Sequence, residues 1–348
     1  MSQKISRAAI FDALNNFAVH GSDLSLMAMR AVKAIELDGR RAQISIALSE
    51  TYRERESDIR NRLSAVISAI EGVERCEIAF EWEARSGAVS VEAQNLLPTV
   101  KNVVAVGSGK GGVGKSMITA NLACALAKRG LRVGVMDADL YGPSLGMMFG
   151  VDGGPNVSPA GYILPVEKYG LKLMSMGFLI EEDQPVIWRG PMLNKALNQF
   201  MTEVEWGELD IILIDLPPGT GDIQISLINS ANVGGAIIVS TPQDVAFLDA
   251  KKAISMFCAV NVPILGVIEN MSSFICPKCK EETPIFGHGG VFEAARAMNL
   301  PFLGEIPIDL QIRIAGDSGA PIAAARPDSP QGRVFRDIAE KIKSALAL

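Results

Sequence analysis

The sequence has few cysteines, no excess of positive charge and no long apolar run. Five cysteines among 348 residues are too sparse, and odd in number, for a framework of disulfide bonds. The net charge of −6 argues against nucleic acid as the main partner, because phosphate backbones require a basic face. No apolar run approaches the ~20 residues that span a bilayer, and polar residues near the amino terminus exclude a signal-peptide core. These absences predict a cytoplasmic protein with neither a nucleic-acid nor a membrane partner.

A glycine-rich loop at residues 107–116 (GSGKGGVGKS) is the most informative stretch that is present. It follows a β-branched run at 101–107 and precedes good helix formers at 117–128, so a strand leads into the loop and a helix leaves it. Glycines suit such a loop because backbone N–H groups can then approach phosphate oxygens where a Cβ would clash. The spacing matches G-x-x-x-x-G-K-[ST] and predicts a nucleotide site rather than an ordinary glycine turn.

The loop residues have distinct expected roles at a bound nucleotide. Lys115 is predicted to be a catalytic cation at the β- and γ-phosphates, and Ser116 to supply a hydroxyl to Mg²⁺. The helix that begins here adds the positive end of its dipole. The predicted nucleotide-binding residues of the loop are Gly109, Lys110, Gly111, Gly112, Val113, Gly114, Lys115 and Ser116.

Lys110 makes the loop more specific, because most phosphate loops have no lysine at this position. The stretch GKGGVGKS resembles the deviant Walker A motif of the ParA/MinD/nitrogenase iron protein class. The resemblance implies that Lys110 reaches across a dimer interface to the phosphates of the other subunit, as a catalytic cation supplied in trans. A solvated lysine beside a polyanion is the alternative interpretation.

Downstream of the loop, strand-like runs alternate with helical stretches. This alternation predicts an α/β fold of the P-loop NTPase type, with a mostly parallel sheet flanked by helices. Ligands of such sheets lie at the carboxyl ends of the strands. The strands are expected at residues 103–107, 132–137, 211–215, 235–240, 264–269 and 302–306.

Carboxylates follow two of these strands at the end where the ligand is expected. Asp215 ends an apolar run and reads as a Walker B aspartate, while Asp137 and Asp139 end the run before it. We expect Asp137 and Asp215 to hold Mg²⁺ together with Ser116, and Asp139 to act in catalysis. A solvated acidic turn is the alternative for residues 137–139.

The base of the nucleotide is expected at later strand ends. Asn270 follows the run at 264–269 and offers both an amide donor and a carbonyl acceptor, which suits adenine. The stretch 305–309 (EIPID) ends the next strand. We therefore predict ATP as the nucleotide, with Asn270 at its base.

Five motifs that occur in order identify a family resemblance. They are DADLYGPS, MSMGFLIEEDQPVIWRGPM, LIDLPPGTGD, TPQDVAFLDA and IENMSSFICPKC, and the match covers about residues 101–323. Over this span the chain resembles the Mrp/ApbC family of iron–sulfur cluster carrier ATPases. The resemblance implies a homodimer that receives a cluster from a donor or scaffold and transfers it to apoproteins, with slow ATP hydrolysis as the switch.

Cys276 and Cys279 form a Cys-x-x-Cys pair after the run at 264–269. One pair supplies two thiolates, whereas an iron–sulfur cluster or a closed zinc site requires four ligands. The homodimer suggested independently by Lys110 would supply the other two thiolates. We therefore expect one [4Fe–4S] cluster shared between two subunits at the two-fold axis.

Other functions remain open at this point. A zinc site made by Cys276, Cys279 and His288 fits the ligand count, and a redox dithiol or a reductase fits the pair. A spatial organiser of the MinD/ParA type is allowed by the same fold, but it does not need the cysteines. A membrane-acting organiser would need a basic amphipathic terminus, whereas acidic residues dilute residues 333–346, which predicts a packing helix.

The chain is predicted to contain a small α+β domain at 1–92, a linker at 93–100 and the ATPase domain at 101–348. The first domain reads as helix (8–16), strands (31–37 and 43–48), helix (54–70) and strand (74–82). This order resembles the MIP18-like domain, although the acidic and cysteine positions of that family are replaced, and we expect a docking or regulatory role. The expected core positions include a stripe on the second helix and two cysteines: Ile59, Leu63, Val66 and Ile70, with Cys124 and Cys258.

Overall fold

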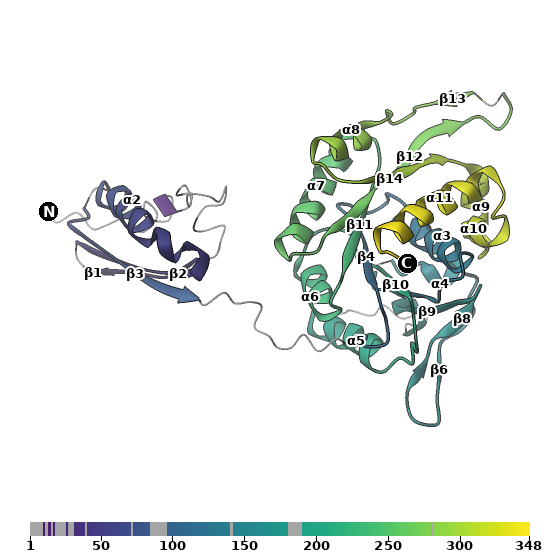
Figure 1. The fold of residues 1–348 in the computed structure, drawn as a ribbon, viewed down its shortest axis with the longest axis horizontal. Coiled ribbons are helices and arrows are strands. Elements are labelled where there is room, and N and C mark those ends of the chain that lie inside the picture. Colours follow the sequence, from purple (N-terminus) through teal and green to yellow (C-terminus); the bar gives the residue numbers. More distant parts are fainter. Residues whose placement is uncertain are drawn as a thin grey trace. The chain divides into compact units, whose positions relative to one another are not determined.

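A computed structural model describes most of the chain (Figure 1). The chain divides into two compact units, Met1–Glu92 and Ala93–Leu348, which are described separately. The helix expected at 8–16 lies largely outside the described residues. The structure describes residues 10, 13–14, 17, 26, 31–38, 40–70, 72–83, 96–139, 142–179, 190–279 and 281–348.

The first unit is built on a three-stranded sheet in the order β1-β2-β3. β1 (Val32–Asp38) and β2 (Arg41–Ser49) form an antiparallel hairpin, and β3 (Arg75–Glu83) pairs parallel to β2. The crossover between the parallel strands contains the 3₁₀ helix η1 (Glu50–Arg55) and α2 (Glu56–Ser68). A parallel pair requires such a crossover, because a tight turn can join only antiparallel strands.

The buried face of α2 differs from the expected stripe at one position. Ile59 and Leu63 are buried as predicted, but Val66 is 41% exposed and Ile67 is fully buried instead. Residues spaced by four lie one above another on a helix of 3.6 residues per turn. Ile59, Leu63 and Ile67 therefore face the sheet, and Val66 faces solvent.

The second unit contains a nine-stranded sheet among the described residues, in the order β13-β12-β11-β4-β10-β5-β9-β8 with β14 beside β12. The pairs β8/β9 and β12/β13 are antiparallel, and the other pairs are parallel. The six predicted strands are present. The strands are β4 (Val103–Ser108), β5 (Val133–Asp137), β8 (Val166–Lys168), β9 (Leu171–Ser175), β10 (Ile211–Asp215), β11 (Gly235–Ser240), β12 (Ile264–Ile275), β13 (Glu282–Thr283) and β14 (Phe302–Ile308).

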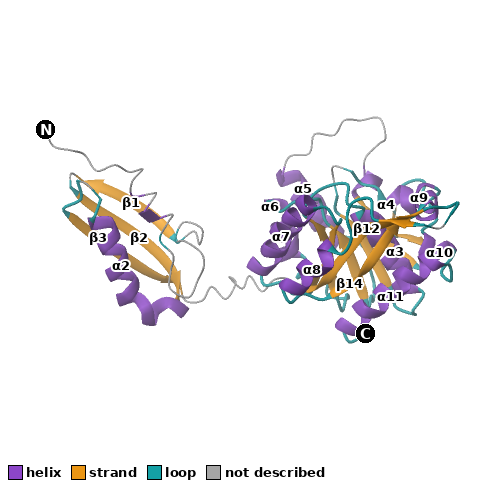
Figure 2. Ribbon diagram, turned by 90° about the horizontal axis from the view of Figure 1, so that it is seen from above, coloured by secondary structure: helices purple, strands orange, loops and turns teal. Residues whose placement is uncertain are grey.

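Helices cover both faces of this sheet (Figure 2). One core cluster contains residues of α5, α6, α7 and α8, and the other contains residues of α3, α4, α9, α10 and α11. A small hairpin of β6 (Asn156–Val157) and β7 (Ile163–Leu164) lies outside the sheet. The helices are α3 (Lys115–Ala127), α4 (Leu145–Met148), η2 (Met176–Leu179), α5 (Gly190–Thr202), α6 (Asp222–Ser230), α7 (Asp244–Ala259), α8 (Gly290–Ala297), α9 (Leu310–Asp317), α10 (Ile322–Ala325) and α11 (Pro330–Ala345).

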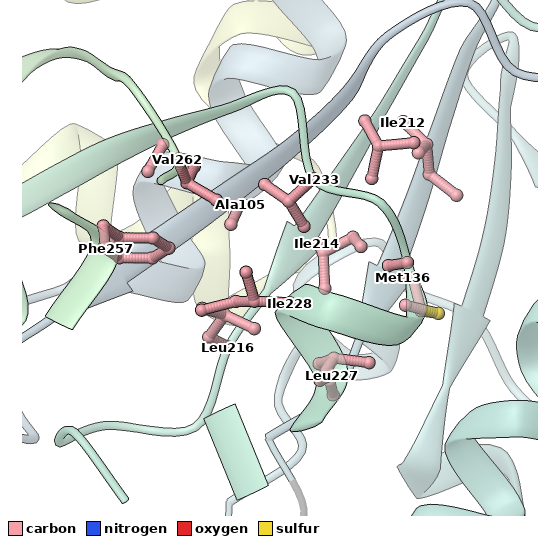
Figure 3. Close-up of a cluster of buried hydrophobic side chains, with 14 of the residues drawn as sticks. Ala105, Met136, Ile212, Ile214, Leu216, Leu227, Ile228, Val233, Phe257 and Val262 are labelled. Carbon is pink, nitrogen blue, oxygen red and sulfur yellow. The ribbon is translucent and has the colours of Figure 1, made fainter. Parts of the chain in front are cut away.

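The central strands are buried on both faces, which explains their continuous apolar sequences. Alternate residues of β4 belong to opposite clusters, with Ala105 on the α6/α7 side and Val104 on the α3 side. Figure 3 shows Leu216, the residue after β10, beside Ile228 of α6. The sheet therefore provides a rigid base for the loops at its carboxyl edge.

The burial of two cysteines on helices tests a further expectation from the sequence. Cys124 is buried, but Cys258 is exposed, contrary to the prediction. Its neighbour Phe257 is fully buried, and the next residue of a helix points ~100° away, so Cys258 faces outward.

The packing helix expected at 333–346 is confirmed as α11, which buries Phe335 and Ile338. No helix in the described part of the chain has the length and apolar character needed to cross a bilayer.

Candidate nucleotide site and cysteine hairpin

The glycine loop connects β4 to α3, as the motif predicts. Gly112 and Gly114 have positive φ angles of 77° and 84°, a left-handed conformation that favours glycine. Gly114 also lies so close to Asn270 that a Cβ there would be 2.2 Å from the amide nitrogen. The backbone shape and the close approach both require glycine at this position.

Asp215, at the end of β10, is the centre of a buried polar cluster under the loop. Its Oδ2 lies 2.8 Å from Lys115 Nζ and accepts a hydrogen bond of 2.5 Å from Ser116 Oγ. Its Oδ1 accepts a hydrogen bond of 2.8 Å from Thr119 Oγ1. Sequence reasoning missed Thr119, although it lies one helical turn after Lys115 and therefore on the same side of α3.

Asp137 lies beside Asp215 because β5 and β10 are paired in register at these residues. Asp137 accepts hydrogen bonds from Ser175 Oγ (2.9 Å) and from the backbone N–H groups of Leu145 and Asp139. Burial, and then the negative charge of Asp215, raise the pKa of Asp137 to about 7. Two adjacent buried carboxylates create a demand for positive charge. Ser175, at the end of β9, was not predicted from the sequence.

The residues of this cluster fit a magnesium–nucleotide complex. Two carboxylates and the Ser116 hydroxyl are oxygen ligands of the kind that Mg²⁺ prefers. Lys115 Nζ is buried and makes no hydrogen bond to any described residue, although it lies 2.8 Å from Asp215 and 3.7 Å from Asp139 Oδ2. An ammonium has three N–H donors, so it can still donate to phosphate oxygens. A cavity of about 240 Å³ opens above the loop and is lined by loop residues, Asp139 and Pro218.

The start of the loop is packed tightly against α7. A Cβ on Gly109 would lie 2.0 Å from the carbonyl carbon of Asp249, so a side chain is excluded there. Lys110 lines the mouth of the cavity and is half-buried, and its carbonyl accepts a hydrogen bond from Ser108 Oγ. The action of Lys110 across a dimer interface stays a prediction.

Asn270 contacts the loop itself. Its Nδ2 donates a hydrogen bond of 2.8 Å to the carbonyl of Val113, and both side chains are buried. The amide nitrogen expected to read a purine is therefore engaged in holding the phosphate loop. A contact between Asn270 and the base stays a prediction.

The cysteine pair lies on a hairpin, not on an irregular loop. β12 continues past Glu269 to Ile275, and the chain returns as β13. We call the described residues 273–279 and 281–283 the cysteine hairpin. The backbone N–H of Cys276 donates to the Glu281 carbonyl, and Ser273 Oγ donates to Glu282 Oε1. Cys276 is half-buried and Cys279 is exposed. The hairpin that carries them ends in β13, which lies at the edge of the sheet (Figure 1).

His288 is not brought to the two cysteines to form a zinc site. Among the described residues, the metal-ligating side chains that gather in a group of three are Glu269, His288 and Glu305. His288 Nδ1 lies 3.9 Å from Glu305 Oε2. The buried Glu269 accepts hydrogen bonds from the N–H groups of Gly289 and Val291, and so caps α8. The combination of Cys276, Cys279 and His288 therefore lacks support within one chain.

Comparison with known proteins identifies similar sequences. The model of the ParA family described as NUBPL iron-transfer P-loop NTPase matches residues 99–343. An iron–sulfur cluster carrier protein of Aquifex aeolicus is 52% identical over 252 residues, which are 72% of this chain and 69% of that protein. An iron–sulfur cluster carrier protein of Escherichia coli is 37% identical over 99% of this chain and 94% of its own length. The second similarity therefore includes the first unit.

A solved structure is also similar. The nucleotide-binding protein of Archaeoglobus fulgidus, in complex with ADP, is 41% identical and superposes with a TM-score of 0.58. The superposition covers 66% of this chain and 90% of that protein. The P-loop NTPase fold expected from the sequence is thus confirmed.

Proposed function

This chain belongs to the ParA family of NUBPL-type iron-transfer P-loop NTPases, and on that basis we propose that it carries a [4Fe–4S] cluster between two subunits. ATP binding and slow hydrolysis act as the switch in this proposal. Recipients are apo iron–sulfur proteins, and a scaffold or donor loads the cluster. Two curated relatives named as iron–sulfur cluster carriers support the carrier role. Neither is named as a spatial organiser, and the MinD/ParA alternative does not account for the cysteine pair.

The position of the cysteine pair is the observation on which the proposal depends. Cys279 is exposed and Cys276 is half-buried at the end of a hairpin on the outer edge of the sheet. Two thiolates are half of what a [4Fe–4S] cluster needs. A second copy of the same hairpin supplies the other half, and exposure at an edge allows two hairpins to meet. The cluster is the cargo of the protein, and the same exposure allows it to leave.

The nucleotide site supplies the switch in this proposal. Ser116, Asp137 and Asp215 would hold Mg²⁺, and the metal ion would neutralise the phosphates and the two buried carboxylates. Lys115 binds the phosphates, and Asp139, 3.7 Å from Lys115 Nζ, orients it. Lys110 of each subunit is proposed to reach the nucleotide of the other, so that ATP also stabilises the dimer.

Anaerobic reconstitution with iron and sulfide tests the proposal. The parent protein should hold four irons per dimer, which follows from four-thiolate ligation of a [4Fe–4S] cluster, and its mass in solution should be that of a dimer. Cys276→Ser and Cys279→Ser should each abolish cluster loading while nucleotide affinity is unchanged. Cys258→Ser is the matched control, because Cys258 is also exposed but lies on α7, and it should load like the parent. Full iron content in a monomer, or normal loading of the Cys276→Ser variant, would overturn the proposal.

A further inference from the structure

Strand β12 contacts the phosphate loop at one point and leads directly into the cysteine hairpin. Asn270 Nδ2 donates to the Val113 carbonyl in the loop. The strand ends at Ile275, and Cys276 follows directly. The residues between Asn270 and Cys276, 271–275, all belong to β12, so an ordered strand and not an irregular loop joins the two sites.

The orientation of the Val113 carbonyl depends on the backbone conformation of the phosphate loop. Val113 lies between two glycines that both have left-handed backbone conformations. A change of φ at Gly114 rotates the peptide group that contains the Val113 carbonyl, because glycine allows φ angles of both signs at little cost. Asn270 is packed so closely on Gly114 that it has to follow such a rotation.

The strand is irregular immediately after Asn270. Met271 has a φ of 59°, which is uncommon for a residue other than glycine and is a genuine departure from strand geometry. The pairing of β12 with β14 also shifts here: Asn270 is opposite Ile306, and Phe274 is opposite Ile308. Four steps along β12 thus match two along β14, which is a bulge. Residues held in rarely populated conformations concentrate at sites that switch.

We propose that β12 couples nucleotide binding to the exposure of the cysteine pair, with Asn270 as the positioning residue and Met271 as the hinge. Nucleotide in the loop moves the Val113 carbonyl, Asn270 follows, and the bulge converts this movement into a rotation of the cysteine hairpin. The identity of the cargo rests on the proposed function above. The coupling itself concerns only the thiols and can be measured without a cluster.

Alkylation of the cluster-free protein by iodoacetamide tests the coupling. The rates at Cys276 and Cys279 are measured by peptide mass spectrometry, without nucleotide and with saturating Mg²⁺ and AMPPNP. Nucleotide should change the rate at Cys279 by about fivefold or more, the lower end of typical coupling between sites. Cys258 is exposed on another element and serves as an internal reference whose rate should not change. An unchanged rate at both thiols of the pair would overturn the coupling.

Two variants test the assigned residues at saturating nucleotide. Asn270→Ala removes the hydrogen bond to Val113 and should reduce the nucleotide response of Cys279 to less than twofold. Met271→Gly permits many backbone conformations at the hinge and should also reduce the response. Asn261→Gly is the matched control, because Asn261 has a φ of 58° but lies in the turn after α7, and its response should equal that of the parent.

The outcomes separate this inference from the proposed function. If Asn270→Ala keeps the full response, Asn270 is not the link, and if Met271→Gly keeps it, Met271 is not the hinge. Iron loading of the same variants should be normal, because the cysteines are intact. Failure of the parent to bind a cluster would contradict the proposed function and leave the alkylation result unaffected.

Discussion

The phosphate loop and the cysteine hairpin follow two parallel strands of the same sheet, β4 and β12, but differ in how completely one chain builds them. Around the loop, the single carboxylate of Asp215 lies within 3 Å of polar atoms of Lys115, Ser116 and Thr119. The described residues of the hairpin are held by the two β12/β13 residue pairs, the backbone hydrogen bond from Cys276 to Glu281 and the side-chain hydrogen bond from Ser273 to Glu282. Cys279, which is expected to bind the cluster, is exposed.

This difference follows from what each site has to do. A nucleotide site must keep its charged groups in fixed positions, because preorganised dipoles and charges are what stabilise phosphates. A cargo site must form and break its contacts, so its ligands lie where a second molecule can reach them. The comparison predicts that changes near the loop affect binding and stability strongly, whereas changes in the hairpin act mainly on the cargo.

Lys115→Ala should have the largest effect on the loop side of this comparison. Loss of the buried ammonium, 2.8 Å from Asp215, should weaken nucleotide affinity by roughly a hundredfold, the cost of about 3 kcal/mol for one partner of a buried charge pair. Iron loading should stay near the parent level, because the cysteines are untouched. Calorimetry of nucleotide binding and iron analysis measure the two effects. A parallel loss of iron would show that the two regions are not built independently.

Gly109→Ala should destabilise the fold strongly. The added Cβ would overlap the Asp249 backbone, and forcing an atom into a packed site costs about 1–3 kcal/mol or more. Gly111→Ala is the matched control, because its Cβ would meet only Pro218 Cγ at 3.8 Å. Urea unfolding of both variants measures the difference. Equal stability of the two would mean that α7 does not press on the loop.

Asp137 should make the stability of the nucleotide-free protein fall as the pH rises. Its pKa is raised from 3.8 to about 7 in the folded protein, so the folded state holds a proton that the unfolded state releases. The contribution is fully present below pH 4 and is lost as the pH rises through 7, with a slope of at most about 1.4 kcal/mol per pH unit. Asp137→Asn should flatten this dependence, and urea unfolding between pH 5 and 8 measures it. A parent and variant that change in parallel would contradict the assignment.

Ser273→Ala should have the smallest effect on stability. It removes the hydrogen bond to Glu282, for which about 0.5–1 kcal/mol is expected. The basal alkylation rate of Cys279 should nevertheless rise, because the hairpin is held by few other contacts. Thermal unfolding and alkylation measure these two quantities. A large loss of global stability would show that the hairpin is part of the core.

Some residues of the site could be predicted because local patterns determine them. The glycine loop, Lys115 and Asp215 follow from short motifs at the junctions of strands and helices, and parallel strands bring their carboxyl ends to one edge. Thr119 could have been found from its position one helical turn after Lys115, whereas Ser175 could not, because it reaches Asp137 only when β9 pairs with β5. Asn270 illustrates both cases: its place near the nucleotide site was predicted, but its contact with Val113 was not.

The burial of side chains was predicted correctly for the strands of the sheet but not for every helical residue, and the reason is physical. The strands of the sheet are continuous apolar runs, and both faces are covered, so no choice of face was needed. The helices required such a choice, and it was wrong for Val66 and for Cys258. A shift of one residue rotates a helical side chain by ~100°. An error of one residue in assigning the apolar stripe therefore predicts a buried position for a side chain that is exposed.

The amino-acid sequence by itself determined the α/β fold, the phosphate loop and the presence of a cysteine pair, because each depends on neighbouring residues and on the period of apolar positions. Only the tertiary structure decided that β12 extends into a hairpin, that Met271 interrupts it, and that Asn270 holds the loop. The contact of Asn270 with the loop joins segments 157 residues apart, and no local pattern records which distant groups will meet.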